Sequence, residues 1–172
     1  MATDVIVYPF GKIEIGLLEA VRAAVGKRFG VGTTLGQELP VPARAYSRER
    51  RQYRSTEFLH RLANLSRDGD HVRLGVVAID LFAPELNFVF GEASAASRVA
   101  VFSTARLDPR FYEEPEDQQI LLRRAVTEGR ARTRPRLRIG PLHAPFLRDV
   151  VLKYAHGDRP ERKRVLRRAL RP

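Results

Sequence analysis

The chain has 172 residues, which suits one domain or one domain with a tail, and it contains no cysteine, which excludes disulfides, thiolate catalysis and cysteine-bound zinc. No apolar run approaches the ~20 residues of a membrane-spanning helix, and the N-terminal segment does not match a secretory signal, so we expect a soluble cytoplasmic protein. Residues 1–128 carry 17 basic and 17 acidic side chains, whereas residues 129–172 carry 14 and 3. The net charge of +11 therefore lies entirely in the last quarter of the chain. We expect a charge-neutral domain, residues 1–128, followed by a basic C-terminal segment, residues 129–172.

The first part of the chain alternates strand and helix signals. The apolar residues 5–9 predict a short buried strand, stopped by Pro9 and Gly11. Residues 14–29 place apolar side chains at helical spacing, and Gly30 is suited to end that helix. We then expect a strand at 31–35, a polar connection at 40–51, and an amphipathic helix over 56–64 with Ser55 as its N-cap.

The middle of the chain predicts a covered sheet. Residues 72–79 are almost uniformly apolar, which is typical of a strand buried on both faces. Residues 88–90 and 99–103 are two further strand candidates, and a helix is expected after Pro115. Strands that alternate with helices indicate an α/β or α+β domain built in layers. Beyond Glu128 the periodicity is lost, except for a basic stretch at 162–170 that suits a helix.

A set of short phrases follows one order along residues 1–128. They are YPFG at 8–11, LPVP at 39–42 with AY at 45–46, RQY at 51–53, LG at 74–75 running to DL at 80–81, LNFVFGEA at 86–93, VAVFS at 99–103 and ARL at 105–107. This ordered set resembles the archaemetzincins, which are metzincin-type zinc peptidases. The resemblance implies a twisted mixed sheet packed against helices, with an edge strand that pairs with an extended peptide or protein substrate.

The catalytic motif of that family is HExxHxxGxxH. Its histidines hold zinc, and its glutamate is the general base for the zinc-bound water. The resemblance places Glu128 at the general base, but Thr127 and Ala131 at the first two ligand positions, where neither side chain can bind zinc usefully. The resemblance therefore implies a zinc cofactor only if the family function is retained. It predicts a metallopeptidase homologue with a degenerate, inactive catalytic site.

Few other residues are candidates for this site. His143, in GPLH at 140–143, has the spacing of the third metal ligand of the family, displaced by an insertion. VLKYA at 151–155 resembles the metzincin Met-turn, with Leu152 in place of the methionine. Asn87, Phe88 and Phe90 are candidate substrate-binding residues, because they would flank a substrate groove. The simpler interpretations are a solvated loop histidine at 143, a surface carboxylate at 128, and an edge strand at 88–90 that belongs to the core.

Two further hypotheses stay open from the sequence. The Arg-rich residues 129–172 suit a nucleic-acid partner bound through counterion release, although they lack the interleaved aromatic residues of a base-stacking surface. Alternatively, a change of reading frame after codon 128 would replace a histidine-rich motif by Arg, Pro and Gly. The resemblance at 151–155 argues against the frame change. No membrane partner is expected.

Overall fold

A five-stranded mixed sheet forms the centre of the computed structural model, which describes residues 4–65, 71–84, 86–94 and 96–127. Three strand pairs are parallel, and the last strand runs antiparallel to its neighbour at the edge of the sheet. In spatial order the strands are β2 (Thr33–Leu35), β1 (Val5–Phe10), β5 (Val72–Val77), β8 (Val99–Ser103) and β7 (Gly91–Ser94).

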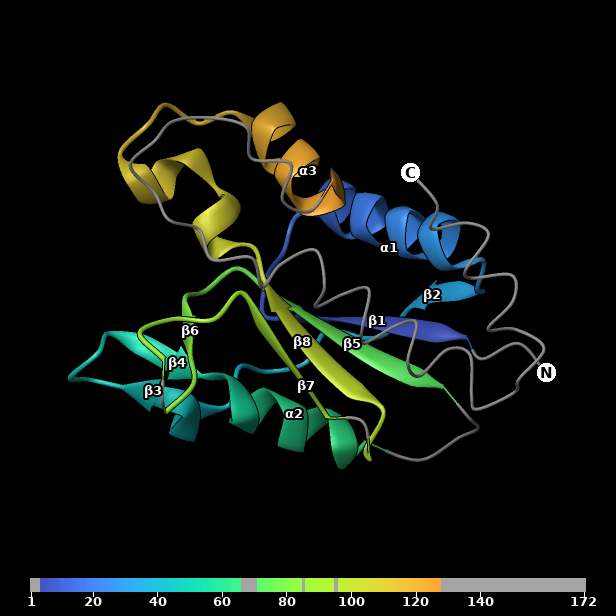
Figure 1. Cartoon of the computed structure of the whole chain (residues 1–172), viewed down its shortest axis with the longest axis horizontal. Helices are drawn as coiled ribbons and strands as arrows, with labels where there is room; N and C mark the ends of the chain where they lie inside the picture. The colour runs from blue at the N-terminus through green and yellow to red at the C-terminus, as the bar shows by residue number, and fades with distance from the viewer. Residues whose placement is uncertain (1–3, 66–70, 85, 95, 128–172) are drawn as a thin grey trace.

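Helices cover both faces of this sheet. Figure 1 shows α1 (Ile15–Phe29) and α3 (Gln118–Thr127) on one face and α2 (Ser55–Ala63) on the other. Each face has its own apolar core: α1 packs with Val5, Val7 and Leu74, whereas α2 packs with Phe10, Val77 and Val101. The layered α/β architecture expected from the alternating signals is confirmed.

Strand β5 joins the two cores. All six of its residues are buried: Val72, Leu74 and Val76 pack in the core beneath α1, whereas Val77 packs in the core beneath α2. The prediction of a strand covered on both faces is therefore confirmed, with an end at Val77 rather than at residue 79. The strand candidate at 99–103 and the helix after Pro115 are confirmed as β8 and α3.

Helix α1 ends as its sequence predicts. Gly30 adopts φ 63°, a left-handed conformation that glycine takes without strain, and its N–H donates to the carbonyl of Gly26 at 2.9 Å. Lys27 and Arg28 lie in the last turn, where the negative end of the helix dipole favours positive charge.

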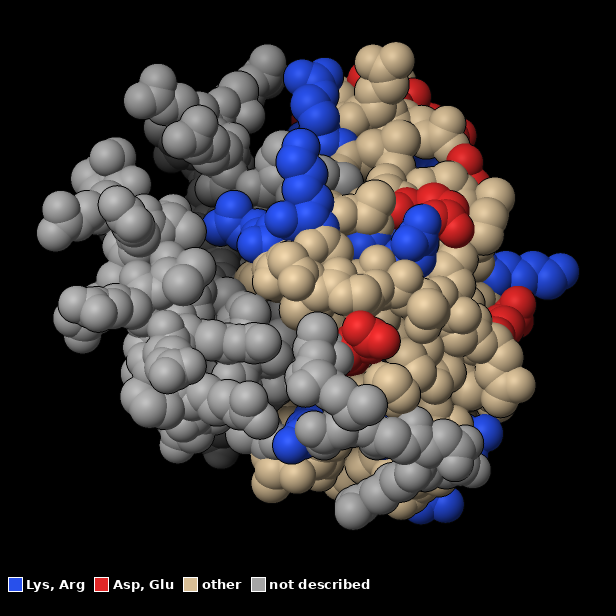
Figure 2. Space-filling view, turned by 90° about the vertical axis from the view of Figure 1, so that its right-hand side faces the viewer, with Lys and Arg blue, Asp and Glu red and all other residues tan. Residues whose placement is uncertain are grey.

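Figure 2 shows the face at the right-hand side of Figure 1, where Lys and Arg side chains lie beside Asp and Glu side chains.

A small second sheet lies beside the first. Its order is β3 (Tyr46–Ser47), β4 (Gln52–Arg54) and β6 (Leu81–Phe82), and a 3₁₀ turn, η1 (Ala43–Ala45), precedes it. Strands β3 and β4 form an antiparallel hairpin, and β4 runs parallel to β6. The expected polar connection at 40–51 therefore contains regular structure. Its elements have only two or three residues each, too few to show a pattern in the sequence.

Two local expectations are wrong. Ser55 is the first residue of α2 rather than its N-cap, and its hydroxyl lies within hydrogen-bonding distance of the Phe82 carbonyl and the Glu92 carboxylate instead of capping the helix. Residues 88–90 are not a strand: Val89 forms an isolated bridge with Leu81, and the edge strand begins afterwards at Gly91. In both cases tertiary contacts override the local pattern.

Among the described residues, no helix is both long and apolar enough to span a bilayer. The expected basic helix at 162–170 lies outside the described residues, as does the whole segment 129–172.

Candidate functional site

Helix α3 leads the chain to the point where the catalytic motif is expected. Its first turn is fixed by Asp117, whose carboxylate accepts the Ile120 N–H at 2.9 Å. Ala125 is buried in the core beneath α1, and Arg124 donates to the carbonyl of Leu107 at 3.1 Å. These contacts orient α3 up to its last residue, Thr127. Glu128 and His143 lie outside the described residues, so their roles stay predictions.

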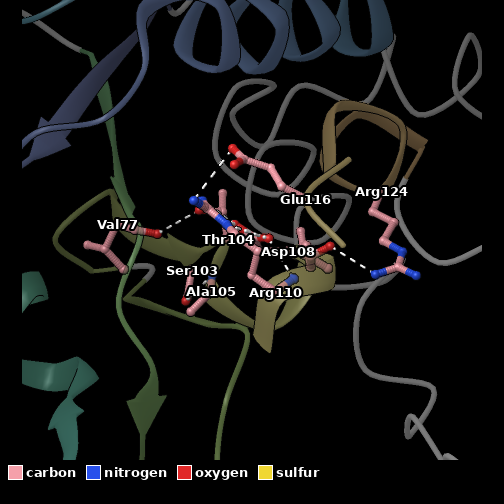
Figure 3. A network of polar contacts seen from close by, with 9 residues as sticks. Val77, Ser103, Thr104, Ala105, Asp108, Arg110, Glu116 and Arg124 are labelled. Atoms are coloured by element: carbon pink, nitrogen blue, oxygen red, sulfur yellow. Dashed lines mark hydrogen bonds and ion pairs between the residues drawn. The ribbon is translucent and has the colours of Figure 1, made fainter. Parts of the chain in front are cut away.

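Two 3₁₀ turns, η2 (Ala105–Leu107) and η3 (Pro109–Tyr112), connect β8 to α3. Figure 3 shows Arg110 extending between Asp108 and Glu116. Arg110 Nη2 lies 2.6 Å from Asp108 Oδ2, and Asp108 also caps η3 by accepting the Arg110 N–H at 2.9 Å. The hydrogen bond from Arg110 lowers the pKa of Asp108 below its ordinary value, although burial opposes the shift.

Thr104 anchors the start of this connection to the sheet. Its N–H and its hydroxyl both donate to the carbonyl of Val77, at 2.8 and 3.2 Å (Figure 3). The neighbouring Ser103 hydroxyl donates to the carbonyl of Ile79 at 2.7 Å. The end of β8 is therefore tied to the end of β5, and the segment leading to α3 starts from a fixed point.

Arg106 connects three segments that are distant in the sequence. Its Nε and Nη2 donate to the two carboxylate oxygens of Asp80, each at 2.7 Å, in a paired geometry that guanidinium groups favour. Its guanidinium carbon lies 4.0 Å from the centre of the Phe88 ring and 4.7 Å from that of Phe111. The cation thus contacts two aromatic rings while it neutralises a half-buried carboxylate.

Gln52 extends this cluster to the candidate substrate-binding residues. Its side-chain nitrogen donates to Asp80 Oδ2 at 2.8 Å and to the carbonyl of Asn87 at 3.0 Å. Asn87 itself is exposed, Phe88 is half-buried, and Phe90 keeps 8% of its surface exposed. The rings of Phe88 and Phe90 meet edge to face, 5.3 Å apart. The structure therefore brings these three residues together, and their contact with substrate stays a prediction.

The edge strand β7 follows this cluster directly. Within the described part of the chain, it pairs only with β8. The Ser103 N–H donates to the carbonyl of Phe90 at 2.7 Å, and hydrogen-bonded and non-hydrogen-bonded pairs alternate in an antiparallel ladder. Ala93, which lies opposite Ala100, therefore belongs to a non-hydrogen-bonded pair and directs its N–H away from β8. An extended peptide could add to this edge.

The described residues do not supply a zinc site. They contain no group of three His, Cys, Asp or Glu side chains placed to hold a metal ion. Of the four histidines, His60 is exposed on α2, and His71 directly precedes β5. A structural or catalytic zinc needs at least three converging protein ligands.

Comparison with known sequences and structures identifies the family of this chain. No family model matches the chain. The archaemetzincin of Pyrococcus furiosus is 35% identical over 135 residues, which cover 75% of this chain and 70% of that protein. The chain belongs to the archaemetzincin family. The solved archaemetzincin of Methanopyrus kandleri aligns at a TM-score of 0.59 with 31% identity, over 72% of this chain and 67% of that one. A zinc-dependent peptidase of Methanocorpusculum labreanum shares the fold at a TM-score of 0.63, with 23% identity over 73% and 76% of the two chains.

The archaemetzincin resemblance and the metzincin-like layered fold are thus confirmed. Sequence reasoning missed the cluster of Arg106, Asp80 and Gln52, although all three residues lie in phrases that carried the resemblance. The available signal was that charged residues such as Arg106 and Asp80 stand within the phrases shared with the family. Their pairing could not be inferred, because 26 and 28 positions separate Arg106 and Gln52 from Asp80.

Proposed function

We propose that this archaemetzincin-family protein is a zinc metallopeptidase homologue that binds extended peptides and does not hydrolyse them. The observation that carries the proposal is the departure from the family motif at the end of α3. The helix delivers the chain to Thr127, and the sequence continues with Glu128 and, at the second ligand position, Ala131. A glutamate without zinc beside it has no metal-bound water to activate.

The peptide-binding part of the proposal rests on β7. Among the described residues, no strand pairs with its outward edge, and Gly91 leaves its first position unobstructed by a side chain. The cluster of Arg106, Asp80 and Gln52 holds the segment that enters this strand. A backbone edge that is fixed in advance loses little conformational entropy when a peptide pairs with it.

Metal analysis of the purified full chain tests the first part. We expect far less than one zinc per chain after gel filtration, and no cleavage of unstructured casein with added zinc. Zinc held in a one-to-one ratio, together with casein cleavage that chelators abolish, would contradict the inactive assignment.

Peptide titration tests the second part. We expect a labelled casein peptide to bind the wild-type chain, and Ala93→Pro to weaken binding because it removes an outward N–H. The ladder to β8 does not use that donor. The matched control is Ala96→Pro, which changes a residue between β7 and β8. Equal binding by all three proteins would exclude the β7 edge as the peptide site.

The second candidate function, nucleic-acid binding through residues 129–172, is favoured by the 14 basic and 3 acidic side chains of that segment. It predicts an affinity that falls steeply with salt. If replacing the arginines of residues 129–172 by glutamine leaves nucleic-acid binding unchanged, this second function is excluded.

A further inference from the structure

Residues 43–54, which we call the basic hairpin, comprise η1, β3, β4 and the turn between the two strands. This short stretch contains five arginines and one glutamate. Its turn projects from the left end of the molecule in Figure 1, and β3 forms an edge of the small sheet. All five arginines are exposed; they are Arg44, Arg48, Arg50, Arg51 and Arg54. The basic hairpin is separate from the predicted basic segment 129–172.

These positive charges are not neutralised within the described structure. Arg44, Arg48 and Arg51 make no ion pair or side-chain hydrogen bond to another described residue. Glu49 offsets only one of the five positive charges. Two other carboxylates bind elsewhere: Asp80 pairs with Arg106, and Glu92 accepts hydrogen bonds from the start of α2. On the face in Figure 2, by contrast, basic and acidic side chains are interspersed. Such uncompensated charge on a projecting turn favours an anionic partner.

Two arginines of the basic hairpin rest on an aromatic ring instead of a carboxylate. The guanidinium carbon of Arg50 lies 4.8 Å from the centre of the Phe82 ring, and that of Arg54 lies 5.8 Å from it. Arg54 is also the N-cap of α2 and makes no capping hydrogen bond. A cation at the positive end of a helix is locally unfavourable. Local rules are most often broken where a residue serves function, so Arg54 indicates a role in binding.

The basic hairpin also presents an aromatic surface. Tyr46 and Tyr53 lie opposite each other in the β3–β4 ladder, with ring centres 5.0 Å apart and planes inclined at 49°. Tyr53 is half-buried against the core beneath α2, so the Tyr46 ring contacts a neighbour that is itself held in place. The side chain of Tyr46 remains 45% exposed. A ring held in this way is a stacking surface for a flat partner.

We propose that the basic hairpin is a binding site for single-stranded nucleic acid, in which arginines contact phosphates and Tyr46 stacks on a base. Arginine binds phosphate through paired donors, and aromatic rings stack on any base. An acidic peptide would satisfy the arginines but would leave the Tyr46 ring unused. A duplex keeps its bases stacked on one another and so offers Tyr46 no free base face. Both features of the surface therefore fit an unpaired strand.

Binding of a labelled single-stranded oligothymidylate to the full chain tests this site. Arg48→Ala with Arg51→Ala should weaken binding at low salt and make the logarithmic salt dependence shallower by about 1.4, because each phosphate contact on a single strand contributes about 0.7. The matched control, Lys27→Ala with Arg28→Ala, removes the same charge at the end of α1. Since binding through residues 129–172 is common to both variants, their difference isolates the basic hairpin.

Tyr46 separates stacking from charge. Tyr46→Ala should weaken oligothymidylate binding on the order of tenfold while leaving the salt dependence unchanged, whereas Tyr46→Phe should bind as the wild type does. Circular dichroism of every variant checks that the fold is kept.

Three outcomes would overturn the proposal. The first is no binding by the wild-type chain. The second is an equal loss in the arginine variant and its control. The third is competition by polyglutamate as strong as that by unlabelled oligothymidylate, with Tyr46→Ala neutral, which would assign the surface to acidic polypeptides. None of these outcomes depends on zinc or on peptide binding at β7.

Discussion

At the scale of single residues, Arg106 combines three contacts that stabilise the candidate site. It pairs with Asp80, its guanidinium contacts two phenylalanine rings, and its carbonyl accepts a hydrogen bond from the Tyr112 hydroxyl at 3.1 Å. The Arg106 and Asp80 side chains are only 21% and 16% exposed, so solvent screens their ion pair less than it screens a surface pair. Burial raises the pKa of Tyr112 above its ordinary value. Tyr112 is therefore protonated and able to donate at neutral pH.

We expect Arg106→Ala to lower the free energy of unfolding by roughly 2 kcal/mol, because it leaves Asp80 half-buried without its cation. Arg106→Lys should recover only part of this loss, since an ammonium group cannot donate to both carboxylate oxygens in the same plane. Urea unfolding measures both values. The matched control is Arg110→Ala, whose side chain is 58% exposed, so its removal should lower the free energy of unfolding much less than Arg106→Ala does. Equal losses at the two positions would contradict the special role of Arg106.

Asp108 predicts a dependence of stability on pH. Its pKa is lowered in the folded state, mainly by the hydrogen bond from Arg110. The carboxylate therefore stabilises the fold above its unfolded pKa, and this contribution is lost as the pH falls through the folded value. Asp108→Asn keeps an acceptor for the Arg110 N–H but removes the charge. We expect the stability difference between wild type and variant to be largest near neutral pH and to shrink below about pH 4. A difference that stays constant with pH would contradict this assignment.

At the scale of elements, local pattern predicted the long ones. The helical spacing of residues 14–29 and the apolar run of 72–79 correspond to α1 and β5, because each buries a continuous set of side chains. The strands of the small sheet have two or three residues each, too few to show a period. The sequence of β7, GEAS, has no apolar alternation. Its strand conformation depends on pairing with β8, which no local pattern encodes.

The centre of β5 is closely packed at Gly75. A Cβ atom there would lie 2.8 Å from Phe10 Cε2 and 3.2 Å from Leu62 Cδ1. Phe10 has little room to move, because its ring packs edge to face on Phe58 at 5.0 Å. We expect Gly75→Ala to destabilise the protein by about 1–3 kcal/mol, measured by urea unfolding.

The control for that substitution is Gly16→Ala in α1, where the nearest atom to a new Cβ lies 3.5 Å away. Alanine favours helix, so this change should be neutral or stabilising by about 0.5–1 kcal/mol. Opposite signs at the two glycines would support the packing described for β5. A neutral Gly75→Ala would show that the space between β5 and α2 is larger than described.

At the scale of the whole molecule, the chain belongs to the archaemetzincin family, and its net positive charge lies in residues 129–172. The family could be predicted because its phrases are spread over the domain and follow one order. The site could be predicted only in part, because family membership does not guarantee that this chain has the zinc-binding side chains of the family motif. Thr127 and Ala131 were visible in the sequence as departures from the zinc motif. The basic hairpin was not identified as a site, because the exposure of its arginines and the contact between the Tyr46 and Tyr53 rings become apparent only in three dimensions.

Thermal unfolding gives a prediction for the whole chain that does not depend on catalysis. A site saturated with zinc at about 1,000 times its Kd would add about 4 kcal/mol to the stability. For a chain of this length, that corresponds to a rise in Tm on the order of 10 °C. Because the described residues hold no suitable ligand group and the first two motif positions lack histidine, we expect zinc and chelators to leave the Tm unchanged. His143→Ala should melt as the wild type does. A large rise with zinc that His143→Ala removes would instead identify His143 as a ligand and restore the zinc-site assignment.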